Sequence, residues 1–212
     1  HYWQDPKRQN GSVRIEWYNT MEYSNPYQIN FIYEDNSGML WLCTNGEGLI
    51  EFNPQGGTYT TYKHNPQNPQ GLSSNDIKGI SQDQEGNYWI ATKFNGLNTF
   101  DKQANKFTHY YEDVFDPGSL SVNMVSAINC ERSGTIWIAS FAGVNKIDRK
   151  NYPFKQYNSV EGSWDKSLNT FVTSIVKRID DKLWVEVRNN DMLLFDPEAE
   201  TFTRQFNKNQ TG

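Results

Sequence analysis

Histidine is the residue most often used as a general base, as the partner of a nucleophile or as a metal ligand, and this chain contains few histidines. The 212 residues include three histidines, His1, His64 and His109. No G-x-S-x-G, H-E-x-x-H, G-x-G-x-x-G or phosphate-binding-loop sequence occurs. The sequence therefore shows no motif for an activated nucleophile, a zinc site or a nucleotide-binding loop. We therefore expect no catalytic residue, no metal site and no cofactor, and we expect this chain not to be an enzyme.

Paired carboxylates are the other chemistry to consider, because a glycosidase needs two of them about 5–10 Å apart. The 25 Asp and Glu residues supply many candidates without marking any pair. A glycan-active hydrolase or lyase that uses acids of the central or top loops therefore stays open as an alternative function. Five aspartates recur beside turn residues, and we expect their side chains to accept hydrogen bonds from turn backbone N–H groups: Asp35, Asp83, Asp101, Asp148 and Asp196.

Charge and cysteine usage argue against several other roles. The net charge is −5, and no block of Lys and Arg could neutralise several phosphates at once, so we expect no nucleic-acid partner. Cys43 and Cys130 have no C-x-x-C or C-x-x-H neighbour and stand in apolar runs, which is typical of buried free thiols. No apolar run approaches the roughly 18 residues that cross a bilayer, so we expect no membrane segment in this chain.

The aromatic residues fall into a repeat that organises the whole chain. Trp41, Trp89, Trp137 and Trp184 lie 48, 48 and 47 residues apart, each inside a short β-type run. An isoleucine precedes each of these tryptophans by nine residues, and a Tyr or Phe follows each by 17 or 18. Because one equivalent ring recurs in every copy, we predict that the four indoles fill the repeat core and that each N–H donates to a carbonyl.

Each copy of the repeat reads as four short strands separated by Gly, Asn or Pro. In the first copy the strands are expected at 29–33, 40–44, 49–52 and 58–62, and helical periodicity is nowhere sustained. A repeat of about 48 residues with four strands is typical of a β-propeller blade, whose faces are covered by neighbouring blades around an axis.

We therefore predict an all-β fold, a β-propeller with four blades of four antiparallel strands. The blades are expected at 25–75, 76–123, 124–170 and 171–212, and the last copy diverges most from the others. Residues 1–24 contain a strand-like run at 13–18 that resembles the outer strand of a preceding blade. That run predicts that the four blades are part of a larger propeller of about seven.

Ligand-binding candidates are the residues that vary between copies in the loops of one propeller end. The turn between the second and third strands and the connection between blades open onto the same end, where ligands usually bind. Trp164 has no counterpart in the other copies, and its flat indole could stack on a sugar ring, or pack over its own loop. The candidate set, expected to line one rim, is Glu47, Lys93, Phe94, Phe141, Trp164, Asp165, Arg188 and Asn189.

The repeat resembles a known family in three of its copies. The strings are DNSGMLWLCTNGEGLIEFN at 35–53, DQEGNYWIATKFNGLNTFD at 83–101 and ERSGTIWIASFAGVNKID at 131–148, with GLSSN at 71–75 and SLSVN at 119–123. This pattern resembles the two-component-regulator propeller repeat, over residues 25–207. In that family the repeats form the periplasmic sensor of hybrid two-component systems, especially in Bacteroidetes.

The resemblance implies a function that the residues alone do not. It implies a periplasmic or extracellular sensor domain that recognises oligosaccharide breakdown products or another small molecule and signals to a histidine kinase outside this chain. The implied partners are that ligand, further propeller blades and the homodimer partner of the parent sensor. Besides the glycan-active enzyme, a propeller platform for protein partners is the remaining alternative.

Overall fold

The computed structural model describes residues 2–4, 12–14, 28–148, 154–157, 171–188 and 191–206. Every regular element in these residues is a strand, so none of them forms a helix that could span a membrane. Four antiparallel sheets of four strands each account for nearly all of the described chain. The predicted all-β fold with four four-stranded blades is therefore confirmed.

We call the sheets blades 1 to 4 in chain order. Blades 1 and 2 contain β3 (Ile29–Glu34), β4 (Leu40–Thr44), β5 (Leu49–Asn53), β6 (Thr58–Tyr62), β7 (Ile77–Gln82), β8 (Tyr88–Thr92), β9 (Leu97–Asp101) and β10 (Lys106–Tyr110). Blades 3 and 4 contain β11 (Val125–Cys130), β12 (Thr135–Ser140), β13 (Gly143–Asp148), β14 (Phe154–Tyr157), β15 (Val172–Lys177), β16 (Leu183–Val187), β17 (Asp191–Asp196) and β18 (Thr201–Phe206). In blade 1, β4 and β6 have the predicted bounds, and β3 and β5 each extend one residue further.

The amino-terminal strand differs from its predicted form. A strand was expected at 13–18, whereas β2 covers Ser12–Arg14 and pairs antiparallel with β1 (Tyr2–Gln4). The run Tyr2–Gln4 thus supplies a partner strand ten residues earlier in the chain, so the expected outer strand is not isolated. Residues 15–18 of the expected strand lie outside the described part of the chain.

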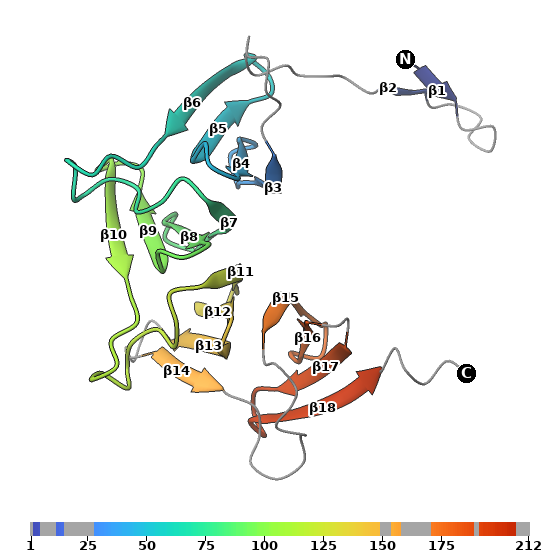
Figure 1. Cartoon of the computed structure of the whole chain (residues 1–212). Coiled ribbons are helices and arrows are strands. Elements are labelled where there is room, and N and C mark those ends of the chain that lie inside the picture. The colour runs from blue at the N-terminus through green and yellow to red at the C-terminus, as the bar shows by residue number, and fades with distance from the viewer. Residues whose placement is uncertain are drawn as a thin grey trace.

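The blades are arranged as an arc, with the first strand of each sheet innermost. Figure 1 shows β3, β7, β11 and β15 along the inner side of the arc and β6, β10, β14 and β18 along its outer side. The inner strands of consecutive blades contact one another, β3 with β7, β7 with β11, and β11 with β15. This radial order is that of a β-propeller.

The hydrophobic core lies between neighbouring blades rather than inside one sheet. Trp41 packs among residues of β7, β8 and β9, Trp89 among residues of blade 3, and Trp137 among residues of blade 4. These three indoles are at most 2% exposed, whereas Trp184 is only partly buried. Among the described residues no further sheet lies beyond blade 4 to cover Trp184 (Figure 1), which explains its partial exposure.

Candidate functional site

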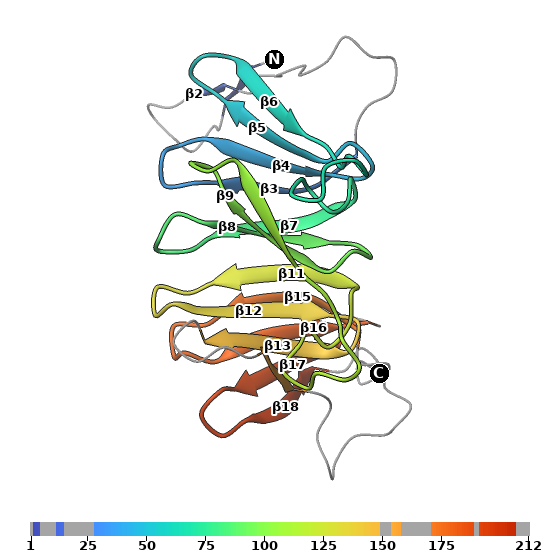
Figure 2. The ribbon, with the colours of Figure 1, turned by 90° about the vertical axis from the view of Figure 1, so that its left-hand side faces the viewer.

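Two kinds of loop meet at one end of the arc, as the sequence predicts. They are the turns between the second and third strands of each blade and the connections that lead to the next inner strand. Figure 2 shows the connections from β6 to β7 and from β10 to β11 on one side of the sheets. The first residue of each turn donates its backbone N–H to the carbonyl just before an inner strand. The pairs are Asn45 to Gln28, Lys93 to Asp76, Phe141 to Met124 and Arg188 to Phe171, at 2.8–3.0 Å.

We call these eight residues the inner rim. One backbone hydrogen bond recurs in four blades, while the side chains around it change completely. They are two amides in blade 1, an ammonium and a carboxylate in blade 2, a phenyl and a thioether in blade 3, and a guanidinium and a phenyl in blade 4. Each inner strand also carries a β-bulge next to this end, as between Ile77 and Gly79, and such bulges re-aim neighbouring side chains.

Glycine and a hydroxyl residue close the turns that carry the rim. Gly48 and Gly96 have φ of +85° and +67°, and a Cβ at either would lie 2.2 Å from a carbonyl oxygen of the outer strand. Thr44 and Thr92 each donate their hydroxyl to the carbonyl of that glycine at 2.7 Å. Only glycine fits this conformation and this approach, so the turn backbone is fixed and its first residue is free to vary.

The L-S-x-N stretches join consecutive blades at the same end. Ser73 donates its N–H to the side chain of Asn98 at 3.0 Å, and the Asn98 amide donates to the Ser73 hydroxyl at 2.7 Å. Two residues later, the carbonyl of Asn75 accepts N–H groups from Gly46 and Gly48 of the preceding blade. The motif therefore connects the third strand of one blade to the turn of the previous one, and it fixes the rim from both sides.

Two of the predicted residues come together in the rim between blades 3 and 4. The rings of Phe141 and Phe171 lie 5.0 Å apart, and the Arg188 guanidinium lies 6.0 Å from the Phe171 centroid. Phe141 is 37% exposed, so part of an aromatic face beside a cation stays accessible to a ligand. Such a surface can stack on the apolar face of a sugar ring while the guanidinium donates to its oxygens.

The other described candidates lie on blades 1 and 2. The Lys93 ammonium lies 4.9 Å from the centroid of Phe94, whose side chain is 53% exposed. Glu47 is ion-paired to Lys63 at 2.5 Å, at the end of the outer strand. Trp164, Asp165 and Asn189 lie outside the described residues.

Sequence reasoning missed Phe171, Met124, Asp76 and Gln28 as rim residues. Their signal was the period itself, because they stand 48, 48 and 47 residues apart, each directly before an inner strand.

Recurring aspartates accept backbone N–H groups of their turns, as predicted, at Asp35, Asp83, Asp101 and Asp196, whereas the side chain of Asp148 lies outside the described part of the structure. Asp35 and Asp83 accept backbone N–H groups of their own turns, and their second oxygens accept the Nε1–H of Trp41 and Trp89 at 2.9 and 2.8 Å. Glu131 accepts the Nε1–H of Trp137 at 2.7 Å. In these three blades the indole N–H donates to a carboxylate, and the expected carbonyl partner is wrong, because the turn places an acid six residues before the ring.

The Asp35 carboxylate also links two blades. The Tyr88 hydroxyl of blade 2 donates to it at 2.7 Å. Burial by itself raises the pKa of Asp35, but hydrogen bonds from Ser37, Trp41 and Tyr88 outweigh it and hold the pKa well below its ordinary value. A carboxylate held charged by five donors is built for structure rather than for proton transfer.

Thiol and metal chemistry find no support in the described residues. Burial raises the pKa of Cys43 above its ordinary value and that of Cys130 to about 12, so neither thiol is activated. Within the described part of the chain, no group of three or more His, Cys, Asp and Glu side chains is placed to bind a metal ion.

A known repeat family matches part of this sequence. The family model described as the two component regulator propeller matches residues 71–94, which run from the first L-S-x-N stretch through the turn that carries Lys93. The chain therefore carries a two component regulator propeller repeat. No curated protein matches the chain.

Solved structures with the same arrangement of blades include two extracellular domains from B. thetaiotaomicron. One is described as that of a hybrid two component system and shares 22% identity at a TM-score of 0.70, covering 89% of this chain and 26% of that one. A second such domain shares 23% identity at a TM-score of 0.70, with coverage of 89% and 26%. The chain thus spans about a quarter of the length of these structures, and the likeness shows the fold.

An enzyme shares the same fold more distantly. Virginiamycin B lyase from Staphylococcus aureus is similar at a TM-score of 0.61 and 16% identity, over 82% of this chain and 54% of that one. The architecture therefore occurs in an enzyme as well as in extracellular domains of two component systems, and function must be argued from the site.

Proposed function

We propose that this chain is the ligand-sensing portion of an extracellular or periplasmic sensor domain of a hybrid two-component regulator. The observation that carries the proposal is the regulator propeller repeat at residues 71–94, set in a fold similar to extracellular domains of hybrid two component systems. The chain does no chemistry in this role. It binds an oligosaccharide, and the histidine kinase lies outside it.

The inner rim supports an oligosaccharide as the ligand. Phe141 and Phe171 offer an aromatic face, and Arg188 and Lys93 offer cationic donors from neighbouring blades. Because each blade contributes a different side chain from an identical backbone position, the rim can contact a chain of unlike sugar units at several points.

Signalling follows from how the sensor is assembled. In the proposal, further blades complete a propeller of about seven, and the parent sensor forms a homodimer. Ligand bound across the rim stabilises one placement of the sensor's parts over another, and the kinase responds to that shift in population.

The test is a thermal-shift screen of the chain against defined oligosaccharides, followed by a product assay on each hit. We expect one class of oligosaccharide to raise the Tm with no product formed. Phe171→Ala should abolish most of that shift, because it removes the ring that contacts both Phe141 and Arg188. Phe115→Gln is the control, because Phe115 is exposed on a different loop. Glutamine is chosen because the preceding connection between blades carries Gln67 at the equivalent position.

Two outcomes would overturn the proposal in favour of named alternatives. Product formation would make the chain a glycan-active enzyme, the alternative that the fold of virginiamycin B lyase favours. A panel without any Tm shift would favour a protein-binding platform. The observation behind that reading is the connection between β10 and β11, which holds Val114 and Phe115 78% and 93% exposed at the tip of two hydrogen-bonded turns.

A further inference from the structure

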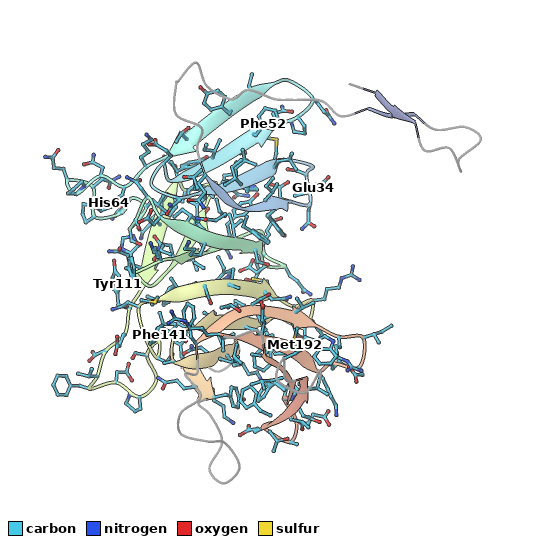
Figure 3. The ribbon with its side chains drawn as sticks, turned by 45° about the vertical axis from the view of Figure 1, so that its right-hand side comes forward. Glu34, Phe52, His64, Tyr111, Phe141 and Met192 are labelled. Carbon is cyan, nitrogen blue, oxygen red and sulfur yellow. The ribbon has the colours of Figure 1, made fainter. Side chains whose placement is uncertain are left out.

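A hollow between blades 1 and 2 collects residues that the repeat does not require. It has a volume of about 300 Å³ and lies at the rim end, between the connection from β6 to β7, the turn after β8 and the end of β10. Figure 3 shows His64 and Tyr111 along the same edge of the molecule as Phe141, opposite Glu34. Both described histidines line this hollow, although 45 residues separate them in the sequence.

Hydrogen bonds to neighbouring carbonyls orient both imidazole rings. His64 Nδ1 lies 2.7 Å from the Leu72 oxygen, and His109 Nε2 lies 2.7 Å from the Gly71 oxygen. A carbonyl oxygen only accepts, so these two nitrogens carry the protons. In the neutral rings, His64 Nε2 and His109 Nδ1 are therefore acceptors, held in place by the backbone behind them.

The next pair of blades shows that the fold does not need these histidines. There Gln156 occupies the place of His109 and donates its Nε2–H to the Ser119 oxygen at 3.2 Å, as His109 does to Gly71. Glu112 stands 48 residues after His64, where no imidazole contact can form. Because the repeat accepts glutamine and glutamate at these positions, we infer that the two histidines of the hollow between blades 1 and 2 have a role other than maintaining blade geometry.

The lining defines the chemistry of what can bind. The described residues around the hollow include no Asp, Glu, Lys or Arg. They offer imidazole acceptors, asparagine amides such as Asn68 and Asn95, and the Tyr111 ring, which is 46% exposed and lies 5.9 Å from His109. An uncharged lining with one aromatic face and several hydrogen-bonding groups suits a neutral molecule rich in hydroxyls. The volume is at the lower end of the roughly 300–1,000 Å³ of small-ligand pockets.

We propose that this hollow is a second binding site, which takes a single neutral sugar ring. The ring stacks on Tyr111, its hydroxyls donate to His64 Nε2 and His109 Nδ1, and the asparagine amides donate to its oxygens. This inference rests on the proposed function for the ligand class. It adds a site on the outer side of blades 1 and 2, away from the rim cluster of Phe141, Phe171 and Arg188.

The test is a long-range ¹H–¹⁵N spectrum of the three imidazoles during titration of the whole chain with xylose, arabinose, glucose and galactose. Concentrations up to about 100 mM are needed, because a ligand this small binds weakly. We expect at least one of these sugars to shift the His64 and His109 signals saturably while the His1 signal stays unchanged. Titration with glycerol, the control, should leave all three signals unchanged. Glucuronate at the same concentration should shift them less, since the lining carries no cation.

Variants taken from the neighbouring blade pair keep the fold while removing the site. His109→Gln preserves the bond to Gly71 that Gln156 makes to Ser119, and Tyr111→Asn introduces the residue that the sequence carries at 158. We expect Tyr111→Asn to weaken the sugar affinity about fivefold through the lost stacking contact. Gln156→His, outside the hollow, should leave the affinity unchanged.

The outcomes separate this inference from the proposed function. If oligosaccharides raise the Tm through Phe171 but no sugar shifts the His64 and His109 signals, the second site is wrong and the sensor proposal stands. If only glucuronate shifts them, the neutral ligand class is wrong. If no sugar gives either a Tm shift or an imidazole shift, both proposals fall.

Discussion

Trp89 of blade 2 and Trp184 of blade 4 occupy the same place in one repeat, yet different interactions hold them. In both blades the residue six positions before the tryptophan donates its backbone N–H to the carbonyl of the residue two positions before the tryptophan. Asp83 donates to Asn87 at 2.9 Å, and Arg178 donates to Lys182 at 2.8 Å. In blade 2 that residue is an acid, which accepts the buried indole N–H. In blade 4 it is Arg178, whose guanidinium lies 5.0 Å from the centroid of a partly buried ring.

The comparison separates what the turn does from what the side chain does. The turn survives loss of the acid, and it survives replacement of a left-handed glycine, because Asp181 adopts φ +62° where Gly86 has +86°. The acid is needed where a following blade buries the ring, since a buried N–H without an acceptor is costly. Where no described sheet covers the ring, water can serve that N–H, and a cation over the ring is sufficient.

The largest effect should come from removing the acid where the ring is buried. Asp83→Ala deprives the backbone N–H groups of Glu85 and Asn87 and the Trp89 indole of their acceptor. We expect the free energy of unfolding to fall by about 3 kcal/mol, measured by urea titration. Asp101→Ala is the matched control in the same blade, because exposed Asp101 accepts only from the Ala104 N–H among the bonds described. Equal losses in the two variants would mean that the acid bound to a buried indole adds no more stability than an exposed turn acid.

Acid should weaken the same kind of bond in blade 1. The folded-state pKa of Asp35 lies below its unfolded value, so its contribution to stability is fully present above about pH 4 and is lost as pH falls through the folded pKa. Protonation weakens the bonds from Ser37, Trp41 and Tyr88 together. The stability difference between the wild type and Asp35→Asn, measured by urea unfolding, should therefore shrink as the pH drops below about 4. A difference independent of pH would contradict the charged role of Asp35.

Removing one donor to that carboxylate should cost less. Tyr88→Phe deletes the hydroxyl that joins blade 2 to Asp35, while the donors from Ser37 and Trp41 remain. We expect a loss of about 1.5 kcal/mol in the free energy of unfolding. Tyr59→Phe, at a tyrosine that is 48% exposed, is the control and should have no measurable effect. If Tyr88→Phe left the free energy of unfolding unchanged, the hydrogen bond between the two blades would add nothing to stability.

The smallest effect should be at the uncovered end. Arg178→Ala removes the cation over Trp184 and the ion pair with Asp180, two contacts made at partly exposed positions. Since such contacts contribute about 0.5 kcal/mol, the free energy of unfolding measured by urea titration should fall by no more than that amount. Arg132→Ala, at an exposed turn position of blade 3, gives the background value. A loss as large as that of Asp83→Ala would show that blades 2 and 4 depend equally on the residue six before the ring.

Local sequence patterns specify the four blades. Alternating apolar residues, turn glycines and a tryptophan period of 48, 48 and 47 act within about 50 residues, so they specify four strands per copy and the faces that must be covered. The same period predicted turn-binding aspartates and placed the variable turns on one end. It even contained the rim partners Gln28, Asp76, Met124 and Phe171, which a comparison of equivalent positions would have found.

Which residues of different blades come into contact depends on how the sheets pack. Phe141 packs on Phe171, the Tyr88 hydroxyl reaches Asp35, and His64 and His109 line one hollow, although 30 to 53 residues separate the members of each pair. These contacts form between different sheets, and their partners depend on how far one blade is rotated against the next. No local pattern encodes that rotation, because it is set by the packing of whole sheets around the axis.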